Sequence, residues 1–288
     1  MDNTTLQYLE RKAFFMGCTD DLESCEKVLL GLPMDSTTSF RPGTRHAPYR
    51  VREVSEAVEE YSIYQDKSLE DILFYDAGDV VIPFGNIYAS LERMEQVARG
   101  FLAEGKKIFS IGGEHLVTLP MVRAYKEKYA DLCVLQLDAH ADLRTDYLGE
   151  ELSHATVMRQ VMKVIGGKNL FQLGIRSGTK EEFQYGALHS NLYVDQVALV
   201  VDEVLEKIGS RPLYITLDID VLDPAFAPGT GTTEAGGISS KELLTTLHRL
   251  ASANVVGFDM VEISPPYDQA DNTSILGAKL MREVLLAY

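Results

Sequence analysis

Residues 132–142 read LCVLQLDAHAD, and the order of apolar and polar residues in this stretch decides the fold class. Leu132–Leu137 is an apolar run of the length and composition of a buried strand. Asp138, His140 and Asp142 follow at alternate positions, and residues i, i+2 and i+4 of an extended segment share one face. The stretch therefore predicts a buried strand whose carboxyl end presents three ligand-type side chains together.

Two other apolar runs end in the same way. Lys107–Ile111 is followed by Gly-Gly-Glu and then His115, and Leu213–Leu217 is followed by Asp218 and Asp220. In open α/β sheets, ligands bind outside the carboxyl ends of the strands. The three runs therefore predict one site at one edge of a sheet, where these polar side chains gather.

The rest of the chain fits the same fold class. Apolar runs alternate with amphipathic stretches, one of which opens with a capping box at Ser239 and Glu242. Such alternation is typical of a parallel sheet covered on both faces. We expect residues 1–288 to form a single-domain, three-layer α/β/α sandwich with a mostly parallel sheet of about eight strands. The expected strands are Val28–Leu32, Ile72–Tyr75, Lys107–Ile111, Leu132–Leu137, Leu170–Ile175, Leu192–Val194, Leu213–Leu217 and Val255–Val261.

The charge balance narrows the class of partner. The chain carries 43 acidic and 27 basic residues, a net charge of −16. Nucleic-acid binders neutralise phosphates with Lys and Arg, so the sequence argues against a nucleic-acid partner. A negative field favours the approach of small cations, although the same charge also serves solubility alone.

The N-terminal segment, the apolar runs and the cysteines indicate the cellular compartment. The sequence MDNTTLQYLERKAFF contains no apolar segment of signal-peptide length, and nowhere do 18 apolar residues follow one another. The three cysteines, Cys18, Cys25 and Cys133, match no zinc spacing and suit a reducing compartment. We therefore expect a cytoplasmic protein with no membrane partner.

The polar residues at the strand ends predict a metal centre. Unpaired carboxylates at the ends of buried strands are costly, so a cluster of four would require cations. Carboxylates with a minority of imidazoles suit a cation such as manganese better than zinc in a thiolate site. The surplus of carboxylates suggests two ions, which could generate a hydroxide and stabilise a developing oxyanion. The six candidate ligands are His115, Asp138, His140, Asp142, Asp218 and Asp220.

The same motifs have plainer explanations when taken singly. An Asp-x-Asp sequence is commonly a turn or a helix cap, and a lone histidine is more often a packed core residue. The recurrence of such motifs at three strand ends favours the metal centre.

With these motifs, the sequence resembles the ureohydrolases, the arginase and agmatinase superfamily. The resemblance is carried by IGGEH at residues 111–115, LDAHAD at residues 137–142 and TLDIDVLDPAFAPGTGTTEAGG at residues 216–237. It extends over nearly the whole chain, and the outer segments LGLPMDSTTSFRPGTRHAP and MVEISPPYD are most similar to the agmatinase branch. It implies an arginase-like fold with two manganese ions per subunit.

The resemblance also implies particular roles. One manganese would be bound by His115, Asp138, Asp142 and Asp218, and the other by Asp138, His140, Asp218 and Asp220. Catalytic roles fall to Asp142, to His154, which matches the proton-shuttle histidine, and to Glu262, which matches the glutamate that holds the guanidinium. His154 and Glu262 would thus also bind the substrate. Without the family, a surface histidine and a solvated loop charge would be the plainer explanations of these last two residues.

The expected activity is hydrolysis of a small cationic guanidino substrate with release of urea. The loop at residues 143–151 has no asparagine and carries Asp146, Glu150 and Glu151, which favours agmatine, whose tail is an amine, over arginine. Arg144 could instead pair with the carboxylate of guanidinobutyrate. Arginase, guanidinopropionase and formimidoylglutamase activities, a metal-dependent deacetylase and a non-catalytic metal-binding scaffold of the same fold remain alternatives. The resemblance to the family also implies a homo-oligomer, either a trimer or a hexamer.

Overall fold

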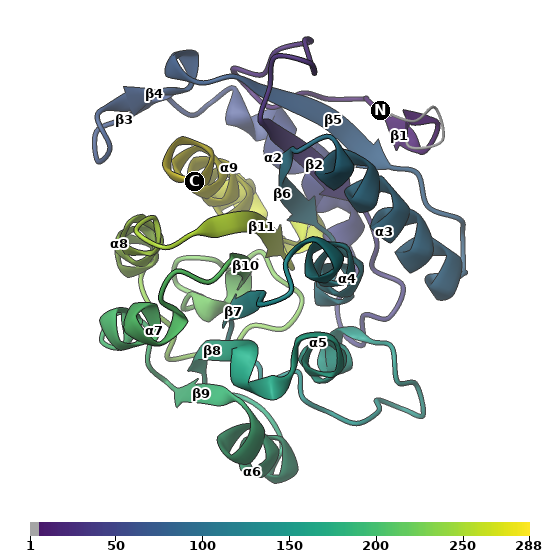
Figure 1. Cartoon of the computed structure of the whole chain (residues 1–288), viewed down its shortest axis with the longest axis vertical. Helices are drawn as coiled ribbons and strands as arrows, with labels where there is room; N and C mark the ends of the chain where they lie inside the picture. The colour runs from purple at the N-terminus through teal and green to yellow at the C-terminus, as the bar shows by residue number, and fades with distance from the viewer. Residues whose placement is uncertain (1–5) are drawn as a thin grey trace.

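A computed structural model describes residues 6–288 and contains a large sheet flanked by helices (Figure 1). The sheet has nine strands in the order β1-β5-β2-β6-β11-β10-β7-β8-β9. Every neighbouring pair is parallel except β1 with β5. The strands are β1 (Leu9–Glu10), β2 (Lys27–Leu32), β5 (Phe74–Val80), β6 (Lys107–Gly112), β7 (Cys133–Leu137), β8 (Leu170–Ile175), β9 (Asn191–Val194), β10 (Leu213–Asp218) and β11 (Val255–Val261).

The order of the central strands determines where the site forms. The chain completes β6 and β7 early, and β10 and β11 later enter the sheet between them. The carboxyl ends of β6, β11, β10 and β7 therefore lie side by side, although they are far apart in the sequence. Such an edge of an α/β sheet is where ligands bind.

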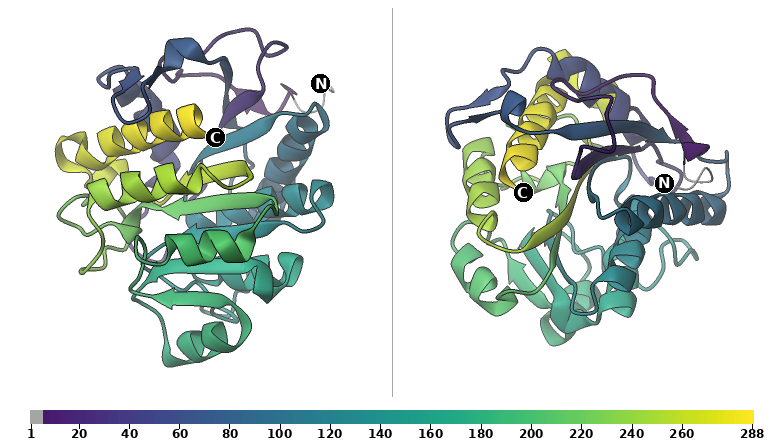
Figure 2. Two further views of the ribbon diagram at one scale, coloured as in Figure 1. Left: turned by 60° about the vertical axis from the view of Figure 1, so that its left-hand side comes forward. Right: turned by 45° about the horizontal axis from the view of Figure 1, so that its top comes forward.

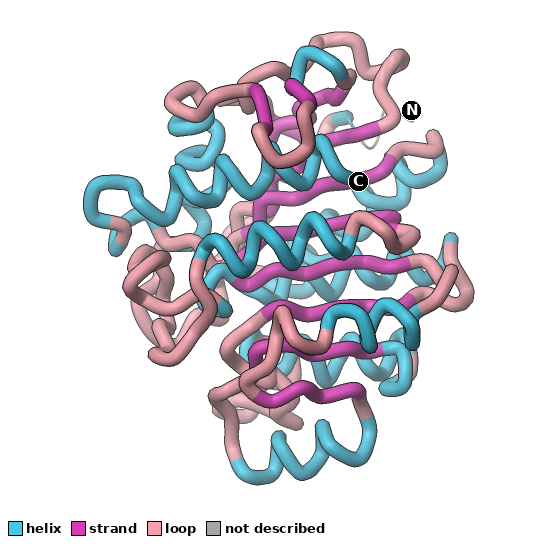
Figure 3. Tube along the Cα trace, turned by 90° about the vertical axis from the view of Figure 1, so that its left-hand side faces the viewer, coloured by secondary structure: helices cyan, strands magenta, loops and turns pink. Residues whose placement is uncertain are grey.

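Helices cover both faces of the sheet, which makes three layers (Figures 2 and 3). On one face α2 (Ala47–Ser55), α9 (Asn272–Ala287), α8 (Ser240–Leu250) and α7 (Val201–Ile208) pack in sequence. On the other, α3 (Ile87–Ala103), α4 (Thr118–Lys128) and α5 (Val157–Ile165) do the same, and α6 (Lys180–His189) lies beyond them at the β9 end.

The core is split by the sheet into two apolar clusters, one under each helical layer. In β7, Cys133, Leu135 and Leu137 contribute to the first cluster and Val134 to the second. This alternation is the period of two that a strand imposes on its side chains. A strand buried on both faces reads as a nearly continuous apolar run, which is why the sequence revealed it.

The predicted three-layer fold is confirmed, and the capping box at Ser239 does open α8, where Ser239 accepts from the amide of Glu242 at 3.2 Å. The expected strand count was wrong by one. The additional strand, β1, is two residues long and pairs antiparallel with β5, so it carries no periodic signal.

The expected strand Ile72–Tyr75 was also misplaced, because the structure has β5 at Phe74–Val80. The missed part includes Asp76 and Asp79, and Asp is depleted in strands. These carboxylates are accommodated by Arg52 of α2, whose guanidinium is fully buried. Arg52 Nε lies 2.8 Å from Asp76 Oδ2, and Nη1 lies 2.6 Å from Asp79 Oδ1.

Within residues 6–288 no helix is long and apolar enough to cross a membrane. Residues 1–5 of the expected domain lie outside the described part of the chain. A small two-stranded sheet, β3 (Tyr61–Ser62) with β4 (Lys67–Ser68), lies apart from the main sheet.

Replacing Arg52 with Met should destabilise the fold strongly, because it leaves Asp76, which has no exposed surface, without its partner. Breaking a buried ion pair from one side costs about 3–5 kcal/mol. The free energy of unfolding from urea denaturation measures this. Arg99→Met is the matched control, since Arg99 pairs with Glu95 and Glu127 at the surface, where a loss of at most about 1 kcal/mol is expected. Equal losses in the two variants would contradict the role given to Arg52.

Candidate metal centre

Four neighbouring strands each deliver side chains to one point at the centre of the sheet edge. His115 begins a 3-10 turn just after β6, and Asp138 directly follows β7. Asp218 is the last residue of β10, and Glu262 directly follows β11. The three strand ends predicted from the sequence therefore do meet, and β11 adds a fourth.

The first cluster surrounds the imidazole of His115. Its Nδ1 lies 3.0 Å from Asp138 Oδ2, 3.1 Å from Asp142 Oδ2 and 3.4 Å from Asp218 Oδ2. All four residues are buried. The other ring nitrogen, Nε2, contacts Thr216 Oγ1 at 3.0 Å, which turns Nδ1 toward the carboxylates.

The second cluster surrounds His140. Its Nδ1 lies 2.8 Å from Asp220 Oδ2 and 3.7 Å from Asp138 Oδ1. Asp138 therefore directs one oxygen to each cluster, the position expected of a carboxylate shared by two ions. The geometry defines two groups able to hold a metal, His115 with Asp138 and Asp218, and Asp138 with His140 and Asp220.

The electrostatics show how much negative charge is confined here. Burial, followed by repulsion from neighbouring carboxylates, raises the pKa of Asp218 well above its usual value and that of Asp142 to about 7. Burial lowers the pKa of His115, but the surrounding carboxylates outweigh it and raise that pKa well above the ordinary value. Two imidazoles thus face four carboxylates in a site with little access to water.

The residues fit a pair of divalent cations. The buried Nδ1 of His115 has no partner with hydrogen-bond geometry in residues 6–288, although three carboxylate oxygens lie within 3.4 Å. Such convergence is expected of ligands around a shared cation. Oxygen ligands in the majority with imidazole in the minority suit hard to borderline divalent cations.

The backbone is strained at two of these positions. Asp142 has φ 51° and Glu262 has φ 66°, in the left-handed region that side chains other than glycine disfavour. Such strain costs of order 1–3 kcal/mol and is retained where the surroundings enforce it, often at functional sites. Close packing also matters beside His115, because a Cβ on Gly113 would lie 1.9 Å from the carbonyl oxygen of Met34.

A layer of polar residues behind the ligands was missed by the sequence analysis. The amide of Gln136 donates to Asp138 Oδ2 at 2.6 Å, and the amide of Gln172 donates to Gln136 Oε1 at 2.7 Å. Both glutamines are fully buried in strands. A polar residue in an otherwise apolar buried strand was the available signal. Partners of this kind orient metal ligands and tune their basicity.

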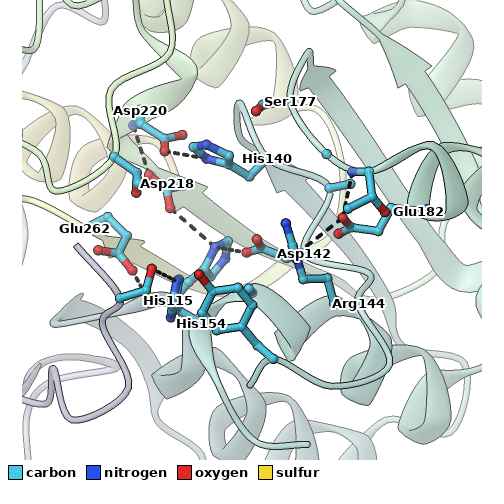
Figure 4. Close-up of a pocket in the computed structure, with 17 residues that line it drawn as sticks. His115, His140, Asp142, Arg144, His154, Ser177, Glu182, Asp218, Asp220 and Glu262 are labelled. Atoms are coloured by element: carbon cyan, nitrogen blue, oxygen red, sulfur yellow. Dashed lines mark hydrogen bonds and ion pairs between the residues drawn. The ribbon is translucent and has the colours of Figure 1, made fainter. Parts of the chain in front are cut away.

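Glu262 and His154 line the same cavity as the ligands, a hollow of about 300 Å³ (Figure 4). Glu262 is 6% exposed, and its Oε1 accepts from the amide of His115 at 2.7 Å. Burial raises the pKa of Glu262 to about 8, so a cation would be needed to keep this carboxylate charged near neutral pH. Glu262 is therefore a buried carboxylate and not a solvated loop charge, whereas His154 is half-buried.

His154 is held by the loop that follows β2. Its amide donates to Thr37 Oγ1 at 3.0 Å, and its Nε2 contacts Ser39 Oγ at 3.2 Å. Thr37 is in turn fixed by Glu114, whose Oε2 accepts from both the amide and the hydroxyl of Thr37 at 2.8 Å. Burial lowers the pKa of His154 to about 4, so its imidazole is neutral near pH 7. Glu114 was noted in the sequence only as part of a motif, and this clamp was not foreseen.

Arg144, whose role the sequence left open, lines the cavity beside Asp142, and Figure 4 shows it turned toward Glu182. Arg144 Nε lies 3.6 Å from Glu182 Oε2. The loop acids behave differently from the expectation. Asp146 accepts from the amide of Gly149, Glu151 lies 3.5 Å from Lys163, and neither lines the cavity. The acidic character of the loop therefore gives no direct contact for a substrate tail.

Comparisons with known proteins agree with this geometry. The model of the arginase family matches residues 26–287. An agmatinase of Bacillus anthracis is 49% identical over 277 residues, which cover 95% of this chain and 96% of that protein. A guanidinobutyrase of Pseudomonas aeruginosa is 34% identical over 277 residues, which cover 92% of this chain and 87% of that protein. The solved structure of agmatine ureohydrolase of Thermoplasma volcanium superposes with a TM-score of 0.86 at 31% identity and covers 98% of this chain and 96% of that one.

The chain belongs to the arginase family. The family and the fold are those of a hydrolase that acts on C–N bonds of linear amidines, and two His/Asp groups of the chain could hold metal ions.

Proposed function

We propose that the protein is an agmatinase that hydrolyses agmatine to putrescine and urea with two manganese ions per subunit, and that it serves polyamine biosynthesis. The observation that carries this proposal is the cavity in which Glu262 lies beside two metal-ligand groups that share Asp138. The choice of agmatine is supported by the greater identity to an agmatinase, 49%, than to a guanidinobutyrase, 34%.

The proposed metal ligands are those expected from the family. His115, Asp138, Asp142 and Asp218 would hold one ion, and Asp138, His140, Asp218 and Asp220 the other. The distances around His115 Nδ1, all within 3.4 Å, support the first set. The contact of His140 with Asp220 and Asp138 supports the second. When bound, two such ions supply an activated water and stabilise the negative charge of the transition state.

Glu262 binds the guanidinium. A guanidinium carries a planar fork of N–H donors that a carboxylate accepts in bidentate fashion. The amide of His115 holds Glu262 Oε1 in place, so the carboxylate is oriented before the substrate arrives. Burial raises the pKa of the free carboxyl to about 8, and a bound cation favours its ionised form. The substrate charge and the ionisation of Glu262 therefore support each other.

His154 carries the proton to the leaving amine. Because its imidazole is neutral near pH 7, it must take up a proton from the reacting water before it can deliver one. The hydroxyl of Ser39 at Nε2 fixes the plane of the ring. Asp142, which lines the same cavity, would orient the water for attack on the guanidinium carbon.

A second candidate substrate is guanidinobutyrate, which one observation favours. Arg144 is a cation in the cavity wall and would attract a carboxylate tail. Its position near Glu182 offsets much of that charge, which leaves agmatine the better candidate.

The remaining properties follow from the family. We propose a single ureohydrolase domain over residues 1–288 that assembles as a trimer or a hexamer and acts in the cytoplasm. The absence of a spanning helix in residues 6–288 is compatible with this location.

The function is tested by urea release from manganese-loaded protein with agmatine, guanidinobutyrate and arginine at equal concentrations. We expect agmatine to give the largest kcat/KM, because its amine tail avoids an unpaired carboxylate near Glu182. Arg144→Gln should change kcat/KM for guanidinobutyrate more than kcat/KM for agmatine. A larger kcat/KM for guanidinobutyrate than for agmatine would mean that guanidinobutyrate is the substrate. Release of no urea from any of the three compounds would contradict the proposed activity.

The clamp on His154 gives a matched pair of variants. Thr37→Val removes the hydroxyl that connects Glu114 to the amide of His154, whereas Thr38→Val removes a hydroxyl that contacts only Glu114, at 3.3 Å. We expect His154→Ala to lower kcat by about 10²-fold or more, as for loss of a proton-transfer group. Thr37→Val removes two hydrogen bonds, each worth about 1 kcal/mol, and should lower kcat by about tenfold. Thr38→Val removes one longer contact and should lower kcat by less. Manganese content, measured alongside, should stay unchanged. Full kcat in His154→Ala would remove it from the mechanism.

A further inference from the structure

A basic hollow outside the metal centre is lined by residues of α5, of α6 and of the turn that follows α5. The helix α6 lies at the β9 end of the molecule (Figure 1). Its volume is about 340 Å³. The eight residues that line it include no carboxylate, in a chain with 43 acidic residues. None of them lines the cavity of the metal centre. The lining residues are Arg159, Met162, Lys163, Gly167, Lys168, Tyr185, Leu188 and His189.

The cations of this hollow are poorly neutralised. Arg159 and Lys168 have no carboxylate partner within residues 6–288, and neither is among the residues with unprinted contacts. Lys163 lies 3.5 Å from Glu151, but both side chains are mostly exposed, so the pair screens little. The imidazole of His189 adds a further N–H donor. Arg159 also lines a neighbouring hollow that contains Asp146, Glu181 and Glu182, but it forms no ion pair with any of them in residues 6–288. The like charges of the basic hollow therefore favour an anion among them.

The arginine is also oriented. The Cζ atom of Arg159 lies 3.3 Å from the centroid of the Tyr185 ring, and the ring of His189 lies 4.4 Å from the same ring. Stacking on an aromatic face restricts a guanidinium while leaving its edge of N–H donors free. A free lysine on a solvated surface has no such restriction. The hollow therefore presents one oriented fork of donors beside two mobile ammonium groups.

We propose that this hollow binds a phosphate group carried by a small molecule. A planar guanidinium matches two oxygens of a tetrahedral oxyanion, and additional ammonium groups favour a dianion over a monocarboxylate. The volume exceeds that of one phosphate and leaves room for the rest of a small metabolite. The first turn of α5 is fixed to the metal centre, since the amides of Met158 and Arg159 donate to the carbonyl of Asp142 at 3.1 and 3.2 Å.

The probe is inorganic phosphate, titrated by calorimetry into manganese-loaded protein that gel filtration has freed of excess metal. Sodium chloride at equal ionic strength is the background. We expect saturable binding of one phosphate per chain. Arg159→Gln and Lys168→Gln should each weaken it about tenfold, the usual loss when one charge-assisted hydrogen bond is removed. Lys168 lies on an exposed 3-10 turn, so its replacement leaves the packing of Arg159 on Tyr185 intact.

Lys180→Gln is the matched control. Lys180 is an exposed lysine at the start of α6, a helix that contributes other residues to the hollow, but Lys180 itself does not line it. It should leave phosphate binding unchanged. Equal weakening by Lys180→Gln would mean general attraction to positive charge and would overturn the proposal. Absence of saturable binding up to about 10 mM phosphate would overturn it as well. Binding that survives both hollow variants and competes with agmatine would place the anion at the metal centre instead.

Discussion

Four aspartates and two histidines meet at the buried carboxyl edge of a parallel sheet, and the repulsion among the carboxylates is the constraint on which the rest of the structure depends. Asp138, Asp218 and Asp220 are almost inaccessible to water, and burial raises the pKa of Asp218 and Asp220. Isolated buried carboxylates are costly, and hydrogen bonds from the surrounding amides offset only part of that cost. Divalent cations are the natural counter-charge. The same cations would activate the water that attacks a guanidinium carbon.

The sheet order makes this convergence possible. Because β10 and β11 enter between β6 and β7, the ends of these four strands lie side by side. In the order β6, β11, β10 and β7, they carry His115, Glu262, Asp218 and Asp138. His115, Asp138, Asp218 and Glu262 lie at or just after strand ends, whereas His154 is held by a contact with the loop that follows β2.

Much of this could be predicted from the sequence because the controlling patterns are local. Apolar runs of strand length ending in Asp or His gave the parallel sheet, its edge and the convergence of the six ligand-type residues. The structure places all six at one point, while their role as manganese ligands stays a prediction. The expected strand at Ile72–Tyr75 was misplaced because Asp76 and Asp79 are tolerated in β5 only through Arg52, a contact across 24 residues.

The clamp from Glu114 through Thr37 to His154 was hidden for the same reason. It joins residues separated by 77 and 117 positions, and neither spacing leaves a periodic signal. The acidic loop after Asp142 was over-interpreted, since Asp146 and Glu151 satisfy local partners and leave the cavity wall to Arg144 and Glu182. Local composition predicts which residue types are present, but the tertiary contacts decide which of them face the substrate.

The most direct test of the central claim is the metal content of the protein, measured by mass spectrometry after loading with manganese and exhaustive dialysis. The account predicts two ions per chain in the unaltered protein. It predicts the loss of both in Asp138→Asn, because this carboxylate faces both clusters. One ion per chain in the unaltered protein, or two retained in Asp138→Asn, would contradict the shared-carboxylate centre.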